Sequence, residues 1–417
     1  MSGPTRTASL YVCYADASEP LVDTQVVPYL SSLAAGGIAI TLLTFEQRPK
    51  SGQERSAIEK KLAGQGIRWR RLPYHKRPSL PATAFDILQG SLFSLFLCLR
   101  DRIPLVHARS HVAAAMGLAV KALLGRKLLF DMRGLLADEY VDAGHWRKGT
   151  LKYSLTKRLE RAFLRQADAV VVLTQAIRSE LVRDHPALEA RLEVIPCCVD
   201  TERFRKAAEP RAAARARHGW GDRFVLAYIG KLGTWYLVDE MARFFAELRS
   251  LDPTALFAVF TQSEHEAMHR ALAAAGVAAQ AYQIGRVAVE AIPAELQAAD
   301  AAISFVRPSY SKKASSPTKI GEYLAAGVLT VANSGVGDCD ELLSLEGAGQ
   351  LVRALDVDEY RRVARLVLDS PRTEEARATR RALASEHLSL SGVGAPRYRR
   401  LYEGLGLAVN AWRREPS

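Results

Sequence analysis

Short apolar runs, many of them β-branched, alternate with amphipathic stretches along two long segments of the chain. In the first segment, the runs that we interpret as strands are SLYVCYA, AITLLTF, LVHARS, KLLFDMR, AVVVLT and LEVIP. The stretches with helical periodicity between them are QVVPYLSSLAAGG, HVAAAMGLAVKALLG and LTKRLERAFLRQA. Short apolar strands with helices between them predict an α/β fold with a parallel, doubly wound sheet.

The same alternation starts again after residue 222. Residues 205–222 are polar and alanine-rich, with Pro210 and two glycines, and we interpret them as a linker with a short helix. The strands predicted after it are RFVLAYIG, ALFAVFT, AQAYQIG, AAISFVR, VLTVANS and GQLVRA. The sequence therefore predicts two α/β domains, residues 1–204 and 223–392. Ligands bind such sheets at the carboxyl ends of the strands, and a cleft between two facing domains is the natural site.

The composition of the chain indicates its cellular compartment and the charge of its surface. The longest apolar run, SLFSLFLCL, stops at Arg100 and is well short of the roughly 18 residues that a membrane span needs. The amino terminus does not resemble a signal peptide, and the five cysteines have no metal-binding spacing, so we expect a cytoplasmic protein. The net charge of +12 predicts a surface that attracts phosphates, anionic lipid or nucleic acid.

The stretch SSPTKIGEYLAAG, residues 315–327, carries unusual polar residues where a helix begins. Ser316 can cap this helix and Pro317 fits its first position, so we predict a helix from about Pro317 to Ala326. At about 100° per residue, one face is apolar and the other is polar. The apolar face has Ile320, Tyr323 and Leu324, and the polar face has Thr318, Lys319 and Glu322.

This helix start follows the predicted strand AAISFVR, and it combines free N–H groups, hydroxyls and a cation. Such a helix start binds anions, so a phosphate can be held there with Lys319. Glu322, one turn deeper, is an acceptor suited to a pair of hydroxyls such as a ribose diol. Phosphate and diol together indicate a nucleotide. A well-capped surface helix with a Lys319–Glu322 pair is the alternative that the spacing leaves open.

The string PTKIGEYLAAGVLTVANSGVGD resembles the nucleotide-sugar site of retaining family 4 glycosyltransferases, which have the GT-B fold. The strings LVDTQVVPYLSSLAAGGIAITLLTFE, FDMRGLLADEYVDAGHW, ADAVVVLTQ, IPCCVDTERF and YIGKLGTWY are similar to the same group, in the expected order. The resemblance implies two Rossmann-like domains facing each other across a cleft. It also implies that residues 393–417 form a last helix that crosses back to the first domain.

The resemblance implies a donor site, residue by residue. Glu322 matches the glutamate that binds the ribose hydroxyls, whereas Ala314 stands where the family usually has a second glutamate on the donor sugar. The stretch YSKKASS, residues 310–316, would then hold the sugar through backbone N–H groups and Ser315, and Ser316 is counted with the donor-binding residues. The remaining donor-binding residues implied by the match are Gly230 and Lys231 on the diphosphate, Thr318 and Lys319 beside it, and Gly285, Arg286 and Val287 against the base.

The same comparison implies the catalytic and acceptor residues. Arg133 stands where the family commonly has a histidine, and we expect it to stabilise the leaving diphosphate together with Lys231 and Lys319. An ion pair of Arg133 with Asp131, Asp138 or Glu139 is the alternative. The glycine pair common after the first strand is replaced by EPLVD. The residues assigned to the acceptor side are Asp23, Gln25, Asp138, Glu139 and His145.

Three strings point elsewhere. HEAMH, residues 265–269, matches a zinc metalloprotease motif, with Glu290 at a plausible distance for a third ligand. The helix would nevertheless pack through other residues and leave both histidines on its polar flank. DCD (338–340) and DVD (356–358) match the metal string of another glycosyltransferase fold, but aspartates are ordinary caps where helices begin. We therefore predict no essential metal and no cofactor.

Residues 146–166 carry seven lysines or arginines, and Leu151, Leu155, Leu159 and Phe163 share one helical face. Such a helix either rests on an anionic membrane or packs its leucines inward and leaves its cations in water. Nucleic acid is not expected, because no recognised module accompanies the charge.

The sequence predicts a cytoplasmic retaining glycosyltransferase that moves a sugar from a nucleotide-diphosphate sugar to a hydroxyl acceptor, with peripheral contact with an anionic membrane as a further option. The expected setting is the synthesis of bacterial glycoconjugates, polysaccharides or glycosylated metabolites. The alternatives are a sugar-nucleotide epimerase or hydrolase of the same fold and a non-catalytic basic binding protein.

Overall fold

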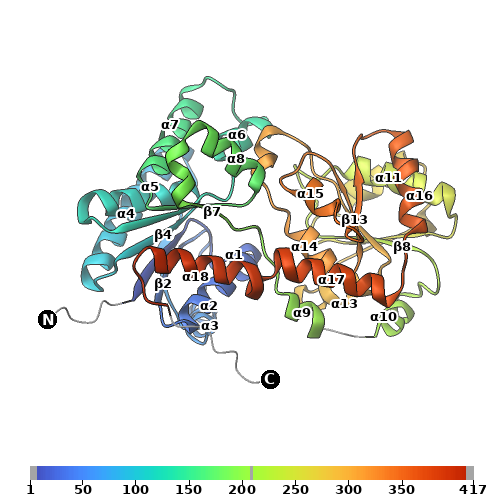
Figure 1. Ribbon diagram of the computed structural model, residues 1–417, viewed down its shortest axis with the longest axis horizontal. Coiled ribbons are helices and arrows are strands. Elements are labelled where there is room, and N and C mark those ends of the chain that lie inside the picture. Colours follow the sequence, from blue (N-terminus) through green and yellow to red (C-terminus); the bar gives the residue numbers. More distant parts are fainter. Residues whose placement is uncertain (1–6, 207–209, 410–417) are drawn as a thin grey trace. The chain divides into compact units, whose positions relative to one another are not determined.

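The computed structural model describes residues 7–206 and 210–409, and the chain divides into two compact units (Figure 1). Unit 1 comprises Met1–Pro196 together with Gly394–Ser417, and unit 2 comprises Cys197–Val393. The first division therefore falls before residue 204, the end of the first predicted domain. The chain returns to unit 1 in α18 (Ala395–Gly404), which packs on α2 (Val27–Ala35). Residues 410–417 of the predicted last segment lie outside the described part.

Unit 1 is built on a parallel sheet with the strand order β3-β2-β1-β4-β5-β6-β7. The order reverses its direction between β1 and β4, which is the doubly wound arrangement expected from the alternating pattern. The strands are β1 (Ala8–Cys13), β2 (Ala39–Glu46), β3 (Ile67–Pro73), β4 (Leu105–Arg109), β5 (Lys127–Asp131), β6 (Ala169–Val172) and β7 (Leu192–Val194).

Helices cover both faces of this sheet. Figure 1 shows α4, α5 and α7 along one face and α2 and α18 along the other. The helices of unit 1, besides α2 and α18, are α1 (Pro20–Gln25), α3 (Gly52–Ala63), α4 (Ser79–Arg100), α5 (Ser110–Leu124), α6 (Leu136–Asp142), α7 (Leu151–Gln166) and α8 (Gln175–Asp184), with a 3-10 turn at Pro186–Arg191.

Unit 2 has a second parallel sheet with the order β10-β9-β8-β11-β12-β13. Its strands are β8 (Val225–Ile229), β9 (Leu256–Phe260), β10 (Tyr282–Gly285), β11 (Ala301–Ser304), β12 (Leu329–Asn333) and β13 (Gly349–Val352). Its helices are α9 (Thr201–Lys206), α10 (Arg211–His218), α11 (Val238–Leu251), α12 (Glu266–Ala274), α13 (Ile292–Ala298), α14 (Thr318–Ala325), α15 (Cys339–Leu343), α16 (Val357–Asp369) and α17 (Glu374–Leu388). Short 3-10 turns lie at Ala279–Ala281, Val289–Ala291 and Tyr310–Ala314, and a π-helical turn at Leu390–Gly394.

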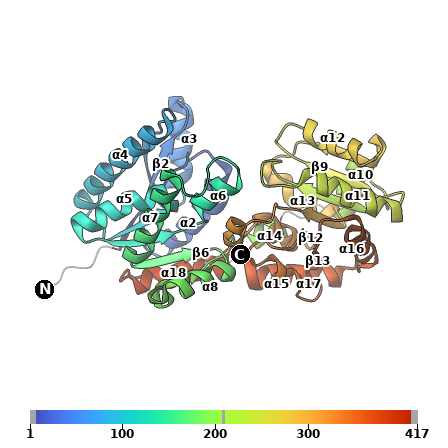
Figure 2. The same ribbon diagram turned by 90° about the horizontal axis from the view of Figure 1, so that it is seen from above.

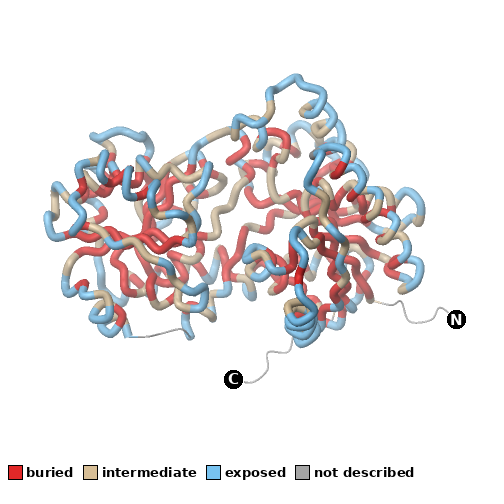
Figure 3. The backbone as a smooth tube through the Cα atoms, turned by 180° about the vertical axis from the view of Figure 1, so that it is seen from behind, coloured by how far each residue is buried: buried red, intermediate tan, exposed pale blue. Residues whose placement is uncertain are grey.

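The side chains of unit 2 pack into one apolar core on each face of the sheet. On β8, Val225 and Ala227 enter the core that holds α14 and α17, whereas Leu226 and Tyr228 enter the core that holds α11 and α16. This alternation follows from the two-residue period of a strand, and it explains why strands buried on both faces read as continuous apolar runs. Figure 3 shows the buried backbone concentrated inside each unit.

The segment 205–222, which its composition predicted to be a linker, contributes to the core of unit 2. Ala214 and Trp220 are fully buried there, and Arg211 and Arg215 form ion pairs with the buried Asp300. Its packing against the core was not predicted from composition, because α10 packs through small alanine side chains and long charged arginine side chains. Residues 207–209 lie outside the described part of the chain.

Candidate functional site

The candidate site of unit 2 begins at the start of α14. The helix begins at Thr318, with Pro317 in the capping position and no side-chain cap. The predicted cap, Ser316, is wrong: its hydroxyl accepts a hydrogen bond of 3.1 Å from the backbone N–H of Cys197. Thr318 and Ser315 are partly exposed, whereas Ala314 is buried. The first turn of α14 therefore keeps its backbone N–H groups without a side-chain cap.

Lys319 is the unusual residue of this helix, because its side chain is buried and forms no ion pair within the described residues. It is only 8% exposed, and its Nζ lies 3.8 Å from the centroid of the Tyr236 ring. Among residues 7–206 and 210–409, no carboxylate lies within ion-pair distance of Lys319, and Glu322 interacts with it only by longer-range attraction. Burying an unpaired charge costs free energy, and a cation–π contact offsets only part of that cost. The ammonium group is thus well placed for an anionic ligand.

Gly230, at the end of β8, makes the position of Lys319 possible. A Cβ on Gly230 would come within 2.8 Å of the lysine Nζ, and the glycine has a positive φ of 136° that other residues rarely adopt. The next residue, Lys231, is exposed, and its carbonyl accepts a 2.7 Å hydrogen bond from the Tyr228 hydroxyl. The structure thus brings together Gly230 and Lys319, which are far apart in the chain.

Glu322 lies one turn further along α14. The residue is partly exposed, yet burial of its carboxyl raises the pKa above its usual value, against the opposing charges of Lys319 and Arg203. Arg203, on α9, was not among the predicted site residues. Arg203 belongs to the string IPCCVDTERF, which resembles the family as a whole, and no single position of that string marks it as a site residue.

The other predicted donor residues follow β10. Gly285 and Val287 are partly exposed and Arg286 is exposed. Gln262 Nε2 donates a hydrogen bond of 2.8 Å to the Val287 carbonyl, which ties this turn to the end of β9. Because β10, β9 and β8 are neighbours in a parallel sheet, their carboxyl ends meet at one edge. The predicted donor residues therefore share one edge of the unit 2 sheet.

Arg133 lies at the corresponding edge of unit 1, just after β5. Its Nη1 is 3.6 Å from Asp131 Oδ1, and Arg109 Nη1 is 3.5 Å from the other oxygen of the same carboxylate. Tyr398 of α18 donates a 3.1 Å hydrogen bond to it. Burial raises the pKa of Asp131, but Arg133, His107 and Arg109 outweigh burial and lower the pKa to about 2. The ion pair considered as the alternative role of Arg133 is therefore present.

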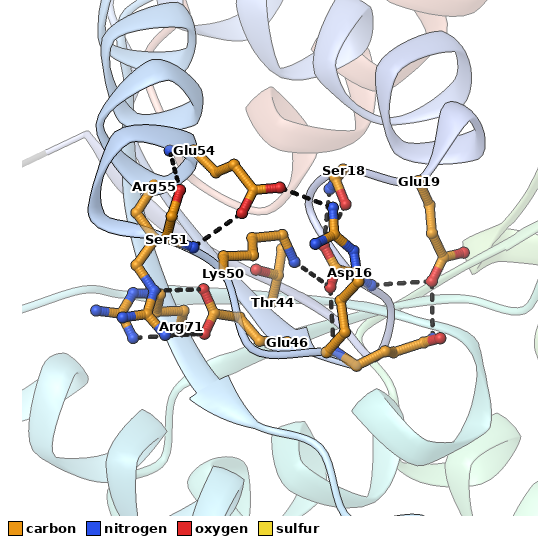
Figure 4. Close-up of polar contacts among 12 residues, drawn as sticks. Asp16, Ser18, Glu19, Thr44, Glu46, Lys50, Ser51, Glu54, Arg55 and Arg71 are labelled. Carbon is orange, nitrogen blue, oxygen red and sulfur yellow. Dashed lines mark hydrogen bonds and ion pairs between the residues drawn. The ribbon is translucent and has the colours of Figure 1, made fainter.

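The loop after β1 is held rigidly by polar contacts (Figure 4). Asp16 forms a buried ion pair with Lys50 and accepts hydrogen bonds from Ser18 and from the Gln47 backbone N–H. Glu19 accepts from the backbone N–H of Asp16 at 3.0 Å. Burial raises the pKa of Asp16, but the Lys50 contact and these hydrogen bonds lower it to about 2. Carboxylates thus shape a loop in which the related family has glycines.

The residues predicted for the acceptor lie in different environments. Asp23 is exposed and pairs with Lys61 at 2.8 Å, and Gln25 is buried. Asp138 is buried and accepts hydrogen bonds from Tyr153 and Lys157, so its carboxylate contacts α7. Glu139 lies beside Gly134, and His145 is exposed next to the ring of Tyr140.

The strings that suggested metals have other contacts. His269 is exposed and its Nδ1 lies 3.1 Å from the Tyr282 hydroxyl, while His265 occupies the capping position of α12 without a side-chain capping bond. Asp356 caps α16 by accepting from the Glu359 backbone N–H, and Asp338 occupies the capping position of α15 without a side-chain hydrogen bond that caps this helix. Within the described residues, no three His, Cys, Asp or Glu side chains gather as metal ligands.

The basic helix α7 differs from the inward-packing alternative. Phe163 is buried, but Leu151, Leu155 and Leu159 are exposed by 83%, 52% and 39%. The helix α4 is long and apolar enough, from Leu80 to Arg100, to pass a length-and-composition test for a membrane span, with 39% of the tested window buried.

Comparisons with known proteins agree with this architecture. Residues 22–198 match the model of the glycosyl transferase 4-like domain, and residues 210–384 match that of the glycosyl transferases group 1. Over 230 residues, 54% of the chain, the sequence is 29% identical to a GDP-mannose-dependent alpha-(1-6)-phosphatidylinositol monomannoside mannosyltransferase of Mycolicibacterium smegmatis. This match spans 58% of that relative's length.

Two solved structures resemble the whole chain. Sucrose-phosphate synthase from Thermosynechococcus elongatus has a TM-score of 0.74 at 17% identity, covering 96% of this chain and 99% of that one. Anabaena HepE in complex with UDP and glucose has a TM-score of 0.69 at 16% identity, covering 95% and 100%. These likenesses confirm the predicted GT-B fold.

Proposed function

We propose that this protein, which belongs to the group 1 glycosyltransferases of the family 4 type, transfers a sugar from a nucleotide-diphosphate sugar to a hydroxyl acceptor with retention of configuration. The observation that carries the proposal is the buried ammonium group of Lys319, which lies beside Gly230 at the start of α14 with an aromatic contact in place of a carboxylate. A diphosphate fits this position, because it supplies the missing negative charge.

The roles of the donor-side residues follow from their positions. Lys319, Lys231 and the N–H groups of the first turn of α14 neutralise the diphosphate, and Glu322 accepts from the ribose hydroxyls. We assign Gly285, Arg286 and Val287 to the base and Ser315 to the sugar. HepE binds UDP and glucose, and the mannosyltransferase relative uses GDP-mannose, so uracil and guanine are the first bases to test.

The chemistry needs little from protein acids and bases. As the bond between the sugar and the diphosphate breaks, the leaving phosphate oxygen takes the proton of the acceptor hydroxyl, and the acceptor oxygen bonds to the sugar on the same face. The protein positions the reactants and stabilises the charge that develops on the diphosphate. Arg133, which is held by Asp131, is assigned as a third cation. No metal or cofactor is assigned to this reaction, since lysines and helix N–H groups already balance the diphosphate.

The protein is proposed to act in the cytoplasm with peripheral contact with an anionic membrane through the basic helix α7. The exposed leucines of α7 and the net charge of +12 support this contact.

A thermal-shift panel of UDP-, GDP-, ADP- and TDP-sugars tests the donor assignment. We expect one base to raise the melting temperature in the wild type and to have much less effect in Lys319→Met. Product analysis with and without acceptor then separates transfer from the epimerase and hydrolase alternatives. A protein that no nucleotide sugar stabilises would instead be the non-catalytic binding protein.

A further inference from the structure

The helix α4 of unit 1 has its polarity reversed relative to an ordinary surface helix. Six of its large apolar side chains are exposed by at least half, whereas Leu97 is buried and Ile87, Phe93 and Leu95 are partly exposed. The six are Leu80 (50%), Phe85 (52%), Leu88 (57%), Leu92 (59%), Phe96 (50%) and Leu99 (58%). A surface helix of a water-soluble domain normally turns such residues toward the core.

The inward face of α4 explains why the reversal is part of the fold. Mostly small and polar residues line it, with Leu97 buried near its end, and Gly90 lies so close to α5 that a Cβ there would approach the sulfur of Met116. Asp86, the only charged residue of the helix before Arg100, is buried and accepts hydrogen bonds from Tyr14 and His75. The outward face of α4 is therefore free of charge over about 30 Å of helix.

The apolar surface continues onto the neighbouring helices. The helix α5 packs against both α4 and α7, and Figures 1 and 2 show the three helices next to one another. Leu123 of α5 is 69% exposed, and α7 adds Leu151, Leu155 and Leu159. More than half of the exposed large hydrophobic side chains of the described residues thus lie on these three helices. We call this α4–α5–α7 surface the apolar face.

Cations border the apolar face on α7. Lys152, Arg158, Arg161 and Arg165 are exposed, and the last three line one surface hollow. In the described ranges, none of the four has an acidic partner. The acid of this helix, Glu160, is buried against His111 and Lys157 and does not offset them.

We propose that the apolar face docks on a bilayer that contains anionic lipid, with α4 lying in the membrane interface and the α7 cations against the headgroups. The inference rests on the membrane contact proposed above and adds the element that inserts. An uncharged helical face beside unpaired cations is the pattern of an interfacial helix. Since α4 packs along α5 over its inward side, it lies in the interface and does not cross the bilayer.

A second copy of the chain fits this surface less well. In a two-fold dimer the same patch meets itself, so the α7 cations of both copies would come together without acids to separate them. Anionic headgroups supply the missing negative charge, and acyl chains cover the leucines and phenylalanines.

The test is flotation with vesicles of phosphatidylglycerol and phosphatidylcholine in equal parts, and with phosphatidylcholine alone. Wild-type protein should float with the anionic vesicles, and the double variant Leu88→Asp/Leu92→Asp should lose at least about tenfold in partition. The matched control is Val357→Asp/Leu366→Asp on α16 of unit 2, where both residues are also exposed, at 50% and 40%. This control should float like the wild type.

A second measurement locates the inserted helix. Phe96→Trp should be quenched by lipids brominated on their acyl chains, whereas Leu366→Trp should not. Equal flotation of Leu88→Asp/Leu92→Asp and wild type would remove α4 from the contact, even if the membrane contact itself stands. Wild-type protein that floats with neither vesicle, or that forms a dimer abolished by the α4 variant, would overturn the proposal.

Measuring nucleotide-sugar binding distinguishes a failure of the membrane proposal from a failure of the proposed transferase function. The α4 variant should show the wild-type thermal shift with nucleotide sugar in vesicle-free buffer, because α4 is distant in sequence from the unit 2 residues. Flotation without any nucleotide-sugar binding would overturn the proposed transferase function while leaving the apolar face as the docking surface.

Discussion

The carboxyl ends of the two sheets handle positive charge in opposite ways. In unit 1, the cations have carboxylate partners: Lys50 pairs with Asp16, and Arg109 and Arg133 share Asp131. In unit 2, Lys319 is equally buried, but its near neighbours are the rings of Tyr236 and Tyr228. At the carboxyl ends of their strands, the two Rossmann-like sheets therefore differ in whether the buried cations have a carboxylate partner.

This difference teaches where to look for the anion. A buried cation that already has a carboxylate offers a ligand little, since the ligand must compete with an existing pair. A buried cation that has only an aromatic neighbour gains most when a phosphate arrives. The predictions below test this contrast between the units.

The largest effect should come from Lys319→Met, which removes the ammonium group and keeps the apolar stem. Losing one cation that stabilises the leaving group should lower kcat/KM roughly 100- to 1,000-fold. The matched control is Lys313→Met, because Lys313 is an exposed lysine in the 3-10 turn Tyr310–Ala314 that precedes α14. Steady-state kinetics with the nucleotide sugar found in the thermal-shift panel decides the matter. Equal kcat/KM in Lys319→Met and Lys313→Met would mean that unit 2 does not use its buried charge.

The next effect should come from Arg133→Ala. Because Arg133 is paired with Asp131, it can act on the reaction only while that pair holds it in place. We expect kcat to fall about 10- to 100-fold with little change in nucleotide affinity, and Arg133→Lys to recover only part, since a point charge does not reproduce a planar guanidinium. Kinetics and melting temperature are measured on the same variants. A loss of stability in proportion to the loss of activity would leave Arg133 a purely structural partner of Asp131.

Much of this architecture was predictable from the pattern of the chain, and the exceptions have physical causes. Strands such as β8 and β12 are buried on both faces, so they stand out as apolar runs. The strand β3 was missed because IRWRRLP carries arginines at partly and fully exposed positions of an edge strand. The helix α4 was not predicted because many of its apolar residues face outward, so its sequence lacks the alternation of apolar and polar faces that marks an amphipathic helix.

The candidate site shows the same limit. Lys319 and Glu322 were identified from the helix motif, but the contact of Lys319 with Gly230 depends on how α14 packs against β8. Local pattern contains no information on that packing, and it could not show that the Ser316 hydroxyl is used by Cys197. Arg109 was missed for the same reason, because its partner Asp131 lies on the next strand.

Glu322→Ala should have a smaller effect than either cation. The substitution removes the acceptor proposed for the ribose hydroxyls while the packing face of α14, with Ile320 and Tyr323, is untouched. We expect nucleotide-sugar affinity to fall about tenfold, which corresponds to about 1.4 kcal/mol for the lost hydrogen bonds. Calorimetry on the wild type and Glu322→Ala measures it. An unchanged dissociation constant would remove the ribose assignment from Glu322.

The raised pKa of Glu322 predicts a further, still smaller effect on stability. Below the ordinary carboxyl pKa, Glu322 is protonated in both the folded and the unfolded chain, so its burial is not penalised. As the pH rises through the raised pKa of the folded state, stability is lost, because the folded protein must bury a charge that the unfolded chain exposes. Glu322→Gln should therefore raise the melting temperature near pH 7 by a few degrees and leave it unchanged near pH 4. An equal shift at both pH values would mean that ionisation of Glu322 is not the cause.

The smallest expected effect is that of a chelator, which should leave turnover unchanged. In the proposed reaction, Lys319, Lys231 and the start of α14 already carry the charge that a divalent ion supplies to a diphosphate elsewhere. Asp356 of the aspartate string at 356–358 caps α16, and His269 of HEAMH contacts the Tyr282 hydroxyl. Turnover is measured in excess EDTA, with zinc, magnesium or manganese added back, and bound zinc is quantified by mass spectrometry. Restoration by zinc of a chelator-inhibited enzyme would return the histidines to consideration. Restoration by magnesium or manganese would show that the cations of unit 2 do not suffice to neutralise the diphosphate. A bound metal, and not only the unpaired Lys319, would then distinguish unit 2 from unit 1.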